Sequence, residues 1–251
     1  MKAALKAELR KLLTVRSTYI LTGIAVLIMA FVSFWIMGYK YSGHIDSNFL
    51  NYNALQAMPV ISLFAVIVAI LLMGHEYRHN TIFYTLTASN SRSKVLASKI
   101  LAVLGYVLVL TIAATAINLL LMNYGHNLAG HPLPHQDLNL ADVITKGLFY
   151  VVGFALAGLL FATLIRNLIF AIVFMLIVPN TVESLLTLLL KHKAVYLPFS
   201  ALSQVIGTQG SNNGPLDMGH LSPGRGAAVF GAYLVVGWLI TWILFLRRDA
   251  N

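Results

Sequence analysis

The chain has 251 residues, of which 59% are hydrophobic and only 10% are charged, and its formal net charge is +9. A water-soluble domain of this length would carry about a quarter charged residues, so the composition excludes an ordinary soluble protein and indicates a membrane protein. The chain has no cysteine, which excludes disulfides, thiolate metal ligands and a thiol nucleophile.

Residues 1–17 are expected to form an amphipathic helix that lies on the cytosolic membrane surface. The segment is not typical of a cleavable signal, because its charged part is too long and no small-residue cleavage site follows. We therefore expect the apolar run after it to be a membrane span. The helical pattern sets one group of leucines against one group of basic residues: Leu5, Leu9, Leu12 and Leu13 against Lys2, Lys6, Arg10 and Lys11.

A helix needs about 20 apolar residues to cross a bilayer. The fourth and fifth apolar segments are separated only by Arg166 and Asn167, which predicts a tight helical hairpin. The sequence thus predicts an all-α polytopic membrane protein with six transmembrane helices in a single domain over residues 1–251. The six predicted spans cover residues 19–39, 58–74, 100–124, 144–165, 168–190 and 227–246.

The distribution of charge predicts the orientation of these spans. Twelve of the 17 lysines and arginines fall before span one, between spans two and three, between spans four and five, or after span six, together with three acids. The other five basic residues lie on the opposite side with five acids, so one side carries a net +9 and the other carries zero. By the positive-inside rule both termini are expected in the cytosol. The basic balance is explained by topology, and no basic–aromatic interleaving indicates a nucleic-acid partner.

Residues 75–79, HEYRH, match the H-E-x-x-H pattern of zinc peptidases. On a helix His75 and His79 lie one turn apart and can hold Zn²⁺, while Glu76 could activate a bound water. A third ligand would have to come from the same side of the membrane, yet the other six histidines fall in segments expected outside. The acids Glu8 and Asp249 belong to no recognisable partner motif. An intramembrane zinc metallopeptidase is therefore an alternative and not the main interpretation.

The residues that follow favour a short cytosolic helix over about 76–88, between spans two and three. Ile82, Phe83 and Leu86 are its apolar positions, and Ser89 or Asn90 is the expected N-cap of the next helix. Such a helix can place apolar side chains in a groove on a partner protein. The pattern equally fits a helix that rests on lipid headgroups.

Two segments are expected outside the membrane. Residues 191–226 precede span six; their first half could dip into the outer leaflet as a short helix, and their glycine-rich second half is expected to be a flexible loop. Another loop holds His126, His131 and His135. We interpret these histidines as solvated loop residues and not as a metal site.

Glu183 is the only acid within a predicted span, and an intramembrane carboxylate is a functional candidate by default. It lies 17 residues past Arg166, which is roughly 25 Å along a helix and so near the outer interface. Pairing with Lys191 or Lys193 is the structural alternative to a role in gating. Pro179 is expected to kink the same span.

Asn118 in span three and Asn180 in span five must find hydrogen-bond partners in the membrane. Helix–helix bonding and substrate contact are both open for these two side chains. Gly153 and Gly158 give span four a face of small residues, which suits close helix packing or a dimer seam. Asn118, Pro179, Asn180 and Glu183 are thus the candidate pathway or gating residues.

Taken together, these motifs resemble the type-2 ATP-binding-cassette exporter permeases, in particular the small bacterial six-span kind. That family has a Glu at the end of span two, then Gly-Thr, a leucine, Ser-Arg and a lysine that opens span three. Asn80 stands where the family has glycine. The segments LKAELRKLLTVRSTYI and AVYLPFSAL resemble the family's interfacial helix and its segment before span six. The matching positions in this chain are Glu76, Thr81, Leu86, Ser91-Arg92 and Lys99.

The resemblance implies the membrane subunit of an ATP-driven exporter in the bacterial cytoplasmic membrane, surrounded by lipid and paired with a second permease copy or a homologous chain. It also implies that this chain is not an enzyme and carries no cofactor, and that ATP and Mg²⁺ bind a separate ABC ATPase subunit. In agreement, the chain has no G-x-x-x-x-G-K-[ST] loop. A transporter without an ATPase is a further alternative. The residues expected to couple to the ATPase are Glu76, Arg78, Thr81, Phe83, Leu86 and Arg92.

Overall fold

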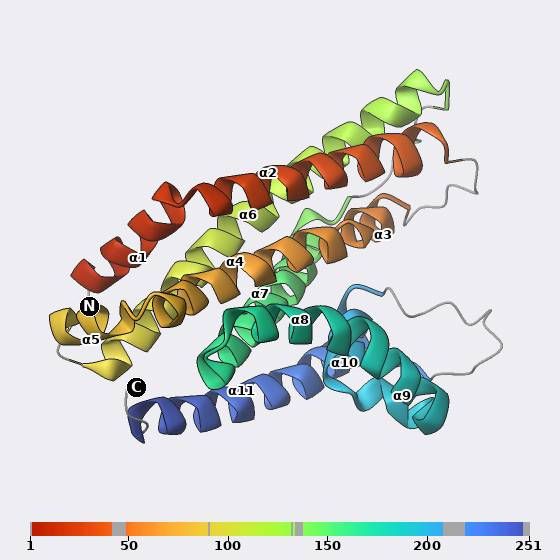
Figure 1. The fold of residues 1–251 in the computed structure, drawn as a ribbon. Coiled ribbons are helices and arrows are strands. Elements are labelled where there is room, and N and C mark those ends of the chain that lie inside the picture. The colour runs from red at the N-terminus through yellow and green to blue at the C-terminus, as the bar shows by residue number, and fades with distance from the viewer. Residues whose placement is uncertain are drawn as a thin grey trace.

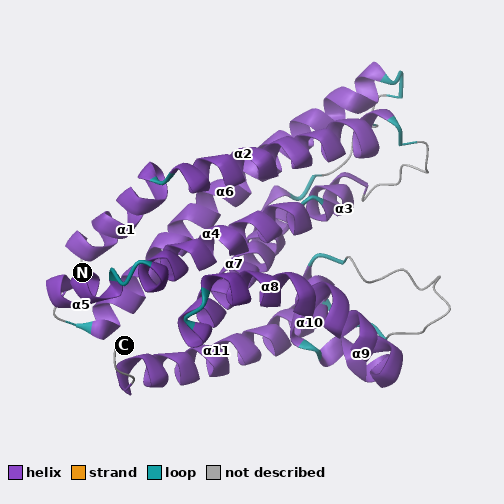
Figure 2. Ribbon diagram, viewed as in Figure 1, coloured by secondary structure: helices purple, strands orange, loops and turns teal. Residues whose placement is uncertain are grey.

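The computed structural model describes residues 2–41, 49–89, 91–131, 133, 138–207 and 219–247. Within these residues all regular structure is helical, and six helical segments are long and apolar enough to cross a membrane. Figure 2 shows nearly all of the described chain as helix, with short stretches of loop and turn. The predicted all-α, six-span membrane fold is confirmed. The six segments are Arg16–Tyr39, Phe49–Arg78, Arg92–Leu128, Leu140–Ile165, Leu168–Tyr196 and Pro223–Arg247.

The first helix, α1 (Lys2–Thr14), leads into α2 (Arg16–Phe31) through a bend at Val15, whose backbone is extended. Figure 1 places α1, the short helix α5 (Ile82–Ser89) and the carboxyl end of α11 (Pro223–Arg247) at one end of the molecule, which we call the basic end. Glu8 and Leu12 of α1 are buried. One face of α1 therefore packs against protein, which differs from a helix that simply lies on the membrane surface.

Spans one and three approach closely at the end of the molecule opposite the basic end. Span one finishes as the π-helix η1 (Val32–Tyr39), which packs along α6 (Arg92–Leu128). A Cβ on Gly38 would lie 2.8 Å from the carbonyl oxygen of Met122, and one on Gly125 would lie 2.6 Å from that of Phe34. Only glycine permits this contact between the two backbones.

The centre of the molecule is formed by α4 (Met58–Arg78) and α7 (Leu140–Ile165), which make the most extensive helix pair. Span two begins with α3 (Phe49–Gln56) and is therefore longer than its apolar run predicts. A Cβ on Gly158 would lie 2.3 Å from Val66 Cγ2, and one on Gly153 would lie 2.7 Å from Phe230 Cε1. The small-residue face of span four is thus used inside the subunit and does not form a dimer seam.

Arg166 ends α7 in the left-handed region (φ 56°), and the Asn167 side chain caps α8 (Leu168–Ile177) by accepting a hydrogen bond from the Phe170 amide. The tight hairpin predicted between spans four and five is confirmed. Span five continues as the π-helix η2 (Val178–Val182), α9 (Glu183–Leu190) and the 3₁₀-helix η3 (Lys191–Tyr196). The irregular segment contains Pro179, which has no amide hydrogen to continue the α-helical ladder.

The segment 191–226 is not one external loop. After η3, the helix α10 (Pro198–Val205) packs against α11, and its Phe199, Ser200 and Leu202 are buried. The prediction of a short helix in the first half is confirmed. The glycine-rich part of the second half, residues 208–218, lies outside the described residues.

Candidate functional site

At the basic end, the chain leaves α4 by a turn that requires a special backbone. His79 caps α4, Asn80 adopts a left-handed conformation (φ 53°), and α5 then begins at Ile82. The Thr81 amide donates to the Glu76 carbonyl over 3.0 Å, which closes the turn. Asparagine and glycine are the residues that best tolerate this conformation. The expected helix over 76–88 is corrected to 82–89, because residues 76–78 still belong to α4.

Four charged side chains meet beside this turn. The Lys99 ammonium lies 3.1 Å from Glu8 Oε2 and 2.8 Å from Glu76 Oε1, and it donates to the Leu72 carbonyl over 3.2 Å. The Lys11 ammonium lies 2.9 Å from Glu8 Oε1 and also bonds Glu76 Oε1. This charged cluster of Glu8, Lys11, Glu76 and Lys99 ties together α1, α4 and α6.

Three members of the charged cluster are shielded from solvent. Lys99 is 0% exposed, Glu8 2% and Glu76 4%. Removing one member of a buried ion pair costs about 3–5 kcal/mol, because it leaves an uncompensated charge in a medium of low polarity. The two acids and two bases balance, so the cluster as a whole is neutral.

Lys11 is the member of the cluster nearest to solvent. Burial alone would lower the pKa of its ammonium, but the hydrogen bonds and charges of Glu76 and Glu8 outweigh this effect and raise the pKa above its ordinary value of 10.5. A raised pKa stabilises the fold below the ordinary value and loses that effect only as pH rises through the raised one. Lys11 therefore stays charged at any physiological pH.

The geometry does not assemble a zinc-peptidase site. The rings of His75 and His79 are 6.2 Å apart, and Oε1 of the Glu76 carboxylate beside them is paired with Lys11 and Lys99. Within the described residues, no group of three His, Cys, Asp or Glu could hold a metal ion. No observation favours the peptidase alternative.

The helix α5 presents two aromatic side chains to the outside of the subunit. Phe83 is 45% exposed and Tyr84 is 77% exposed, whereas Ile82 is buried and Leu86 packs partly against the core. Of the three expected apolar anchors, only Phe83 faces outward, and Tyr84 was not among them. Helical geometry explains this, because Ile82 and Leu86 are four residues apart and share the face toward the protein.

The other residues expected to couple to the ATPase differ in their exposure and in their contacts. Arg78 and Thr81 are exposed beside the turn. Arg92 instead donates to the Phe245 carbonyl over 3.3 Å, where a cation favourably meets the carboxyl end of α11. The helix that follows α5 is capped by Ser91, whose side chain accepts from the Lys94 amide. The prediction of Ser89 as the cap is wrong, and Asn90 lies outside the described residues.

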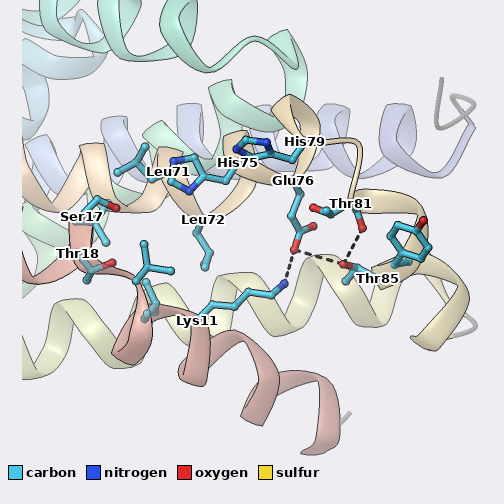
Figure 3. Close-up of a pocket in the computed structure, with 14 residues that line it drawn as sticks. Lys11, Ser17, Thr18, Leu71, Leu72, His75, Glu76, His79, Thr81 and Thr85 are labelled. Carbon is cyan, nitrogen blue, oxygen red and sulfur yellow. Dashed lines mark hydrogen bonds and ion pairs between the residues drawn. The ribbon is translucent and has the colours of Figure 1, made fainter.

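A pocket of about 430 Å³ opens between the bend of α1 and α2, the end of α4 and the start of α5. Figure 3 shows Lys11, Glu76 and Thr85 linked along one side of it, with His75 and His79 on α4. The Thr85 hydroxyl donates to Glu76 Oε1 over 3.4 Å. The charged cluster thus forms part of the pocket wall and connects it to α5.

Glu183 has a structural partner that the sequence did not predict. Its carboxylate is buried and accepts hydrogen bonds from the Phe199 amide (3.0 Å), the Ser200 amide (2.6 Å) and the Ser200 hydroxyl (2.8 Å). These amides belong to the first turn of α10, where a negative charge meets the positive end of the helix dipole. Glu183 therefore caps α10, and pairing with Lys191 or Lys193 is wrong.

The remaining pathway candidates separate into a buried and an exposed group. Asn118 is buried and donates across helices to the Ala54 carbonyl over 3.1 Å. Asn180 is exposed in the π-helical segment beside Pro179 and donates to the Leu176 carbonyl of its own helix over 2.9 Å. Only Asn180 presents a polar group to the outside of the subunit.

One histidine expected in a solvated loop is part of the core. His126 belongs to α6, is 0% exposed and packs edge-on against Tyr41 and Phe49. The loop interpretation is wrong for His126, because α6 extends to Leu128, beyond its predicted end. His131 is exposed, and His135 lies outside the described residues.

Sequence reasoning missed Glu8 as a member of the site. A signal was present: Glu8 lies three residues after Leu5 and four before Leu12, so it shares their helix face. Lys99 was found only as part of the resemblance, although it stands alone at the start of a long apolar run. Two sequence features therefore indicate this buried pair: an acid on the apolar face of a helix, and a lysine at the start of a membrane span.

The sequence profile of a family described as protein of unknown function (DUF2705) matches residues 24–250. No curated protein matches the chain. The family match covers all six spans except the first residues of span one.

Proposed function

The chain belongs to the family described as protein of unknown function (DUF2705), and we propose that it is the transmembrane subunit of an ATP-driven exporter. The observation that carries the proposal is α5, which holds Phe83 and Tyr84 exposed at the basic end while Ile82 anchors it in the core. Exposed aromatic side chains on a fixed helix suit a groove on a partner protein. The partner in this proposal is a separate ABC ATPase subunit, which binds ATP and Mg²⁺.

The charged cluster provides a path from α5 into the membrane helices. Glu76 accepts from Thr85 of α5 and is paired with Lys99 of α6 and Lys11 of α1. Breaking such buried pairs costs about 3–5 kcal/mol, which is comparable to the free energy that switches a two-state membrane element. A displacement of α5 is therefore expected to move together the parts of α1, α4 and α6 that lie at the basic end.

The turn before α5 also supports the resemblance to type-2 exporter permeases. That family has glycine where this chain has Asn80. The left-handed backbone of Asn80 (φ 53°) is the conformation that glycine adopts freely and asparagine tolerates. The departure from the family pattern thus preserves the same backbone turn.

The proposal extends to the assembly and its orientation. The chain is a multi-pass membrane protein; we infer that it lies in the bacterial cytoplasmic membrane with its basic end and both termini in the cytosol. Two copies, or this chain and a homologue, would line the pathway. The exposed Asn180 beside Pro179 is the candidate pathway residue that faces out of the subunit.

Co-purification with an ABC ATPase tests the proposal. The chain is co-expressed with an ABC ATPase from its own organism, and the amount of ATPase retained on the tagged membrane subunit is measured in detergent. Phe83→Ala and Tyr84→Ala are each expected to weaken retention about tenfold, because buried aromatic anchors dominate interface energies.

Tyr124→Ala is the matched control, since Tyr124 is 61% exposed on α6 far from the basic end. This variant is expected to retain the ATPase as the wild type does. If the wild-type chain retained no ABC ATPase, or if the α5 variants retained it fully, the proposed function would be wrong.

A further inference from the structure

The pocket at the basic end has the size and position of a ligand site. Its volume of about 430 Å³ falls in the range of small-molecule pockets. It lies where the bend of α1 and α2 meets α4 and α5 (Figure 3). Binding in this pocket is independent of the exporter proposal, which does not require the pocket to be filled.

The pocket is lined by both apolar and polar side chains. Glu76, His75, His79 and Ser17 provide polar groups, and the apolar lining comes from α1, the bend at Val15 and α4. An occupant that matches both kinds of lining has an apolar body and a polar head. The apolar lining residues are Leu12, Val15, Val68, Leu71 and Leu72.

Two oxygen atoms of the polar lining have no hydrogen-bond partner. Lys11, Lys99 and Thr85 all converge on Oε1 of Glu76, whereas Oε2 is buried and has no hydrogen-bond partner. The Glu76 side chain is only 6% exposed, so water does not replace a partner freely. The Ser17 hydroxyl oxygen is likewise buried without a partner. Buried acceptors of this kind are normally satisfied.

The unsatisfied carboxylate oxygen selects the head group. An anionic head has only acceptors and cannot donate to Oε2, and a hydroxyl could donate only one hydrogen bond. A primary ammonium has three N–H donors and forms the stronger, charge-assisted bonds to a carboxylate. Lys11 lines the same pocket, but its charge is compensated by Glu8 and Glu76.

We propose that this pocket binds an amphiphile with a primary ammonium head. The head donates to Glu76 Oε2, and the apolar chain lies along Val68 and Leu71. The same chemistry is offered by a free lipophilic amine and by the ethanolamine headgroup of a membrane lipid.

Direct binding of dodecylamine to the full chain tests the proposal. The protein is reconstituted without any ATPase in phosphatidylcholine nanodiscs at pH 8, where imidazoles of ordinary pKa are neutral. Binding of the radiolabelled amine is measured, and binding to empty nanodiscs is subtracted. We expect saturable binding of one amine per chain. Dodecanol and dodecyltrimethylammonium are expected to bind about tenfold more weakly or worse, because they lack the charged N–H donors.

A pair of tryptophan variants on α4 separates the pocket from the bulk lipid. Leu71→Trp fills the pocket without altering the charged cluster and is expected to weaken binding at least about tenfold. Leu63→Trp places the same side chain on the exposed face of the same helix, outside the pocket, and is expected to bind like the wild type. Glu76→Gln should weaken binding too. If that variant fails to fold, the comparison of Leu71→Trp with Leu63→Trp still tests the proposal.

Nanodiscs that contain phosphatidylethanolamine distinguish the two sources. If that lipid lowers the apparent affinity of the wild type for dodecylamine, the natural occupant is the headgroup; if it has no effect, the site is assigned to a free amine. Equal affinity of the wild type and Leu71→Trp, or equal binding of dodecanol and dodecylamine, would overturn the proposal. Neither result bears on the ATPase interaction of α5.

Discussion

Glu8 and Lys99 lie 91 positions apart in the chain, yet their charged atoms are 3.1 Å apart in a region closed to solvent. Each of them would be costly to bury alone. Together with Lys11 and Glu76 they form a neutral group that joins three helices. The location of these four residues at the basic end explains why charges are tolerated next to membrane spans.

Lys99→Ala is expected to destabilise the protein by about 3–5 kcal/mol, because Glu8 and Glu76 would share a single cation. The thermal unfolding midpoint in detergent should fall by roughly 10 °C. Lys94→Ala is the control: Lys94 is exposed on the same helix, and its loss is expected to change the midpoint little. Equal midpoints for the two variants would contradict the role given to the cluster.

Glu183→Ala is expected to cost about 1.5–3 kcal/mol, since a charged acceptor of three hydrogen bonds is removed from the first turn of α10. The neighbouring variant Ser184→Ala alters an exposed side chain and should change stability by about 0.5 kcal/mol or less. Thermal unfolding of both variants in the same detergent checks this. A Glu183→Ala protein as stable as Ser184→Ala would show that the cap is dispensable.

At the scale of the elements, the helix pair α4 and α7 depends on the absence of side chains. Gly158 brings the backbone of α7 so close to Val66 that a Cβ would lie 2.3 Å from its Cγ2 atom. Without water inside the membrane, such packing is a principal source of helix association. The sequence indicated close packing by this face but did not identify its partner.

Gly158→Ala is expected to destabilise the protein by about 1–3 kcal/mol through overpacking. Gly105→Ala is the matched control on α6, where a Cβ would meet nothing within 4 Å; alanine there should be neutral or slightly stabilising. Unfolding midpoints of the two variants give the comparison. A neutral Gly158→Ala would mean that Val66 can move aside at no cost.

At the scale of the whole molecule, the basic end gathers α1, α5 and the carboxyl end of α11 (Figure 1). An even number of spans places both termini on one side of the membrane. From the charge pattern we expect this side to be cytosolic, and the proposed ATPase contact on α5 requires the same orientation.

The absence of cysteine makes this orientation directly testable by single-cysteine labelling. Lys6→Cys and Tyr84→Cys are expected to react with a membrane-impermeant maleimide only after the cells are permeabilised. Leu128→Cys and His220→Cys, which are exposed near the opposite end, should react in intact cells. The reverse pattern would invert the topology and remove α5 from reach of a cytosolic ATPase.

Parts of the site could be read from the sequence because they depend on neighbours in the chain. The expected helix over 76–88 runs through Asn80, so the turn there is not predicted, but the hairpin at Arg166 and Asn167 and the kink near Pro179 follow from local backbone chemistry. The burial of Glu8, Lys99 and Glu183 does not, since each is satisfied by a group on another helix. The sequence therefore assigned Glu8 no partner, and it placed Glu183 near the outer interface only by its distance along the helix from Arg166.

The sequence by itself determined six apolar helices and a strongly basic set of connections. The physical reason is that a chain in lipid must satisfy its backbone hydrogen bonds within each span, so that length and apolarity suffice to define the helices. Only the tertiary structure decided which polar groups meet across helices. Those pairings depend on the rotation and depth at which the helices pack, and many arrangements of six apolar helices are compatible with one pattern of hydropathy.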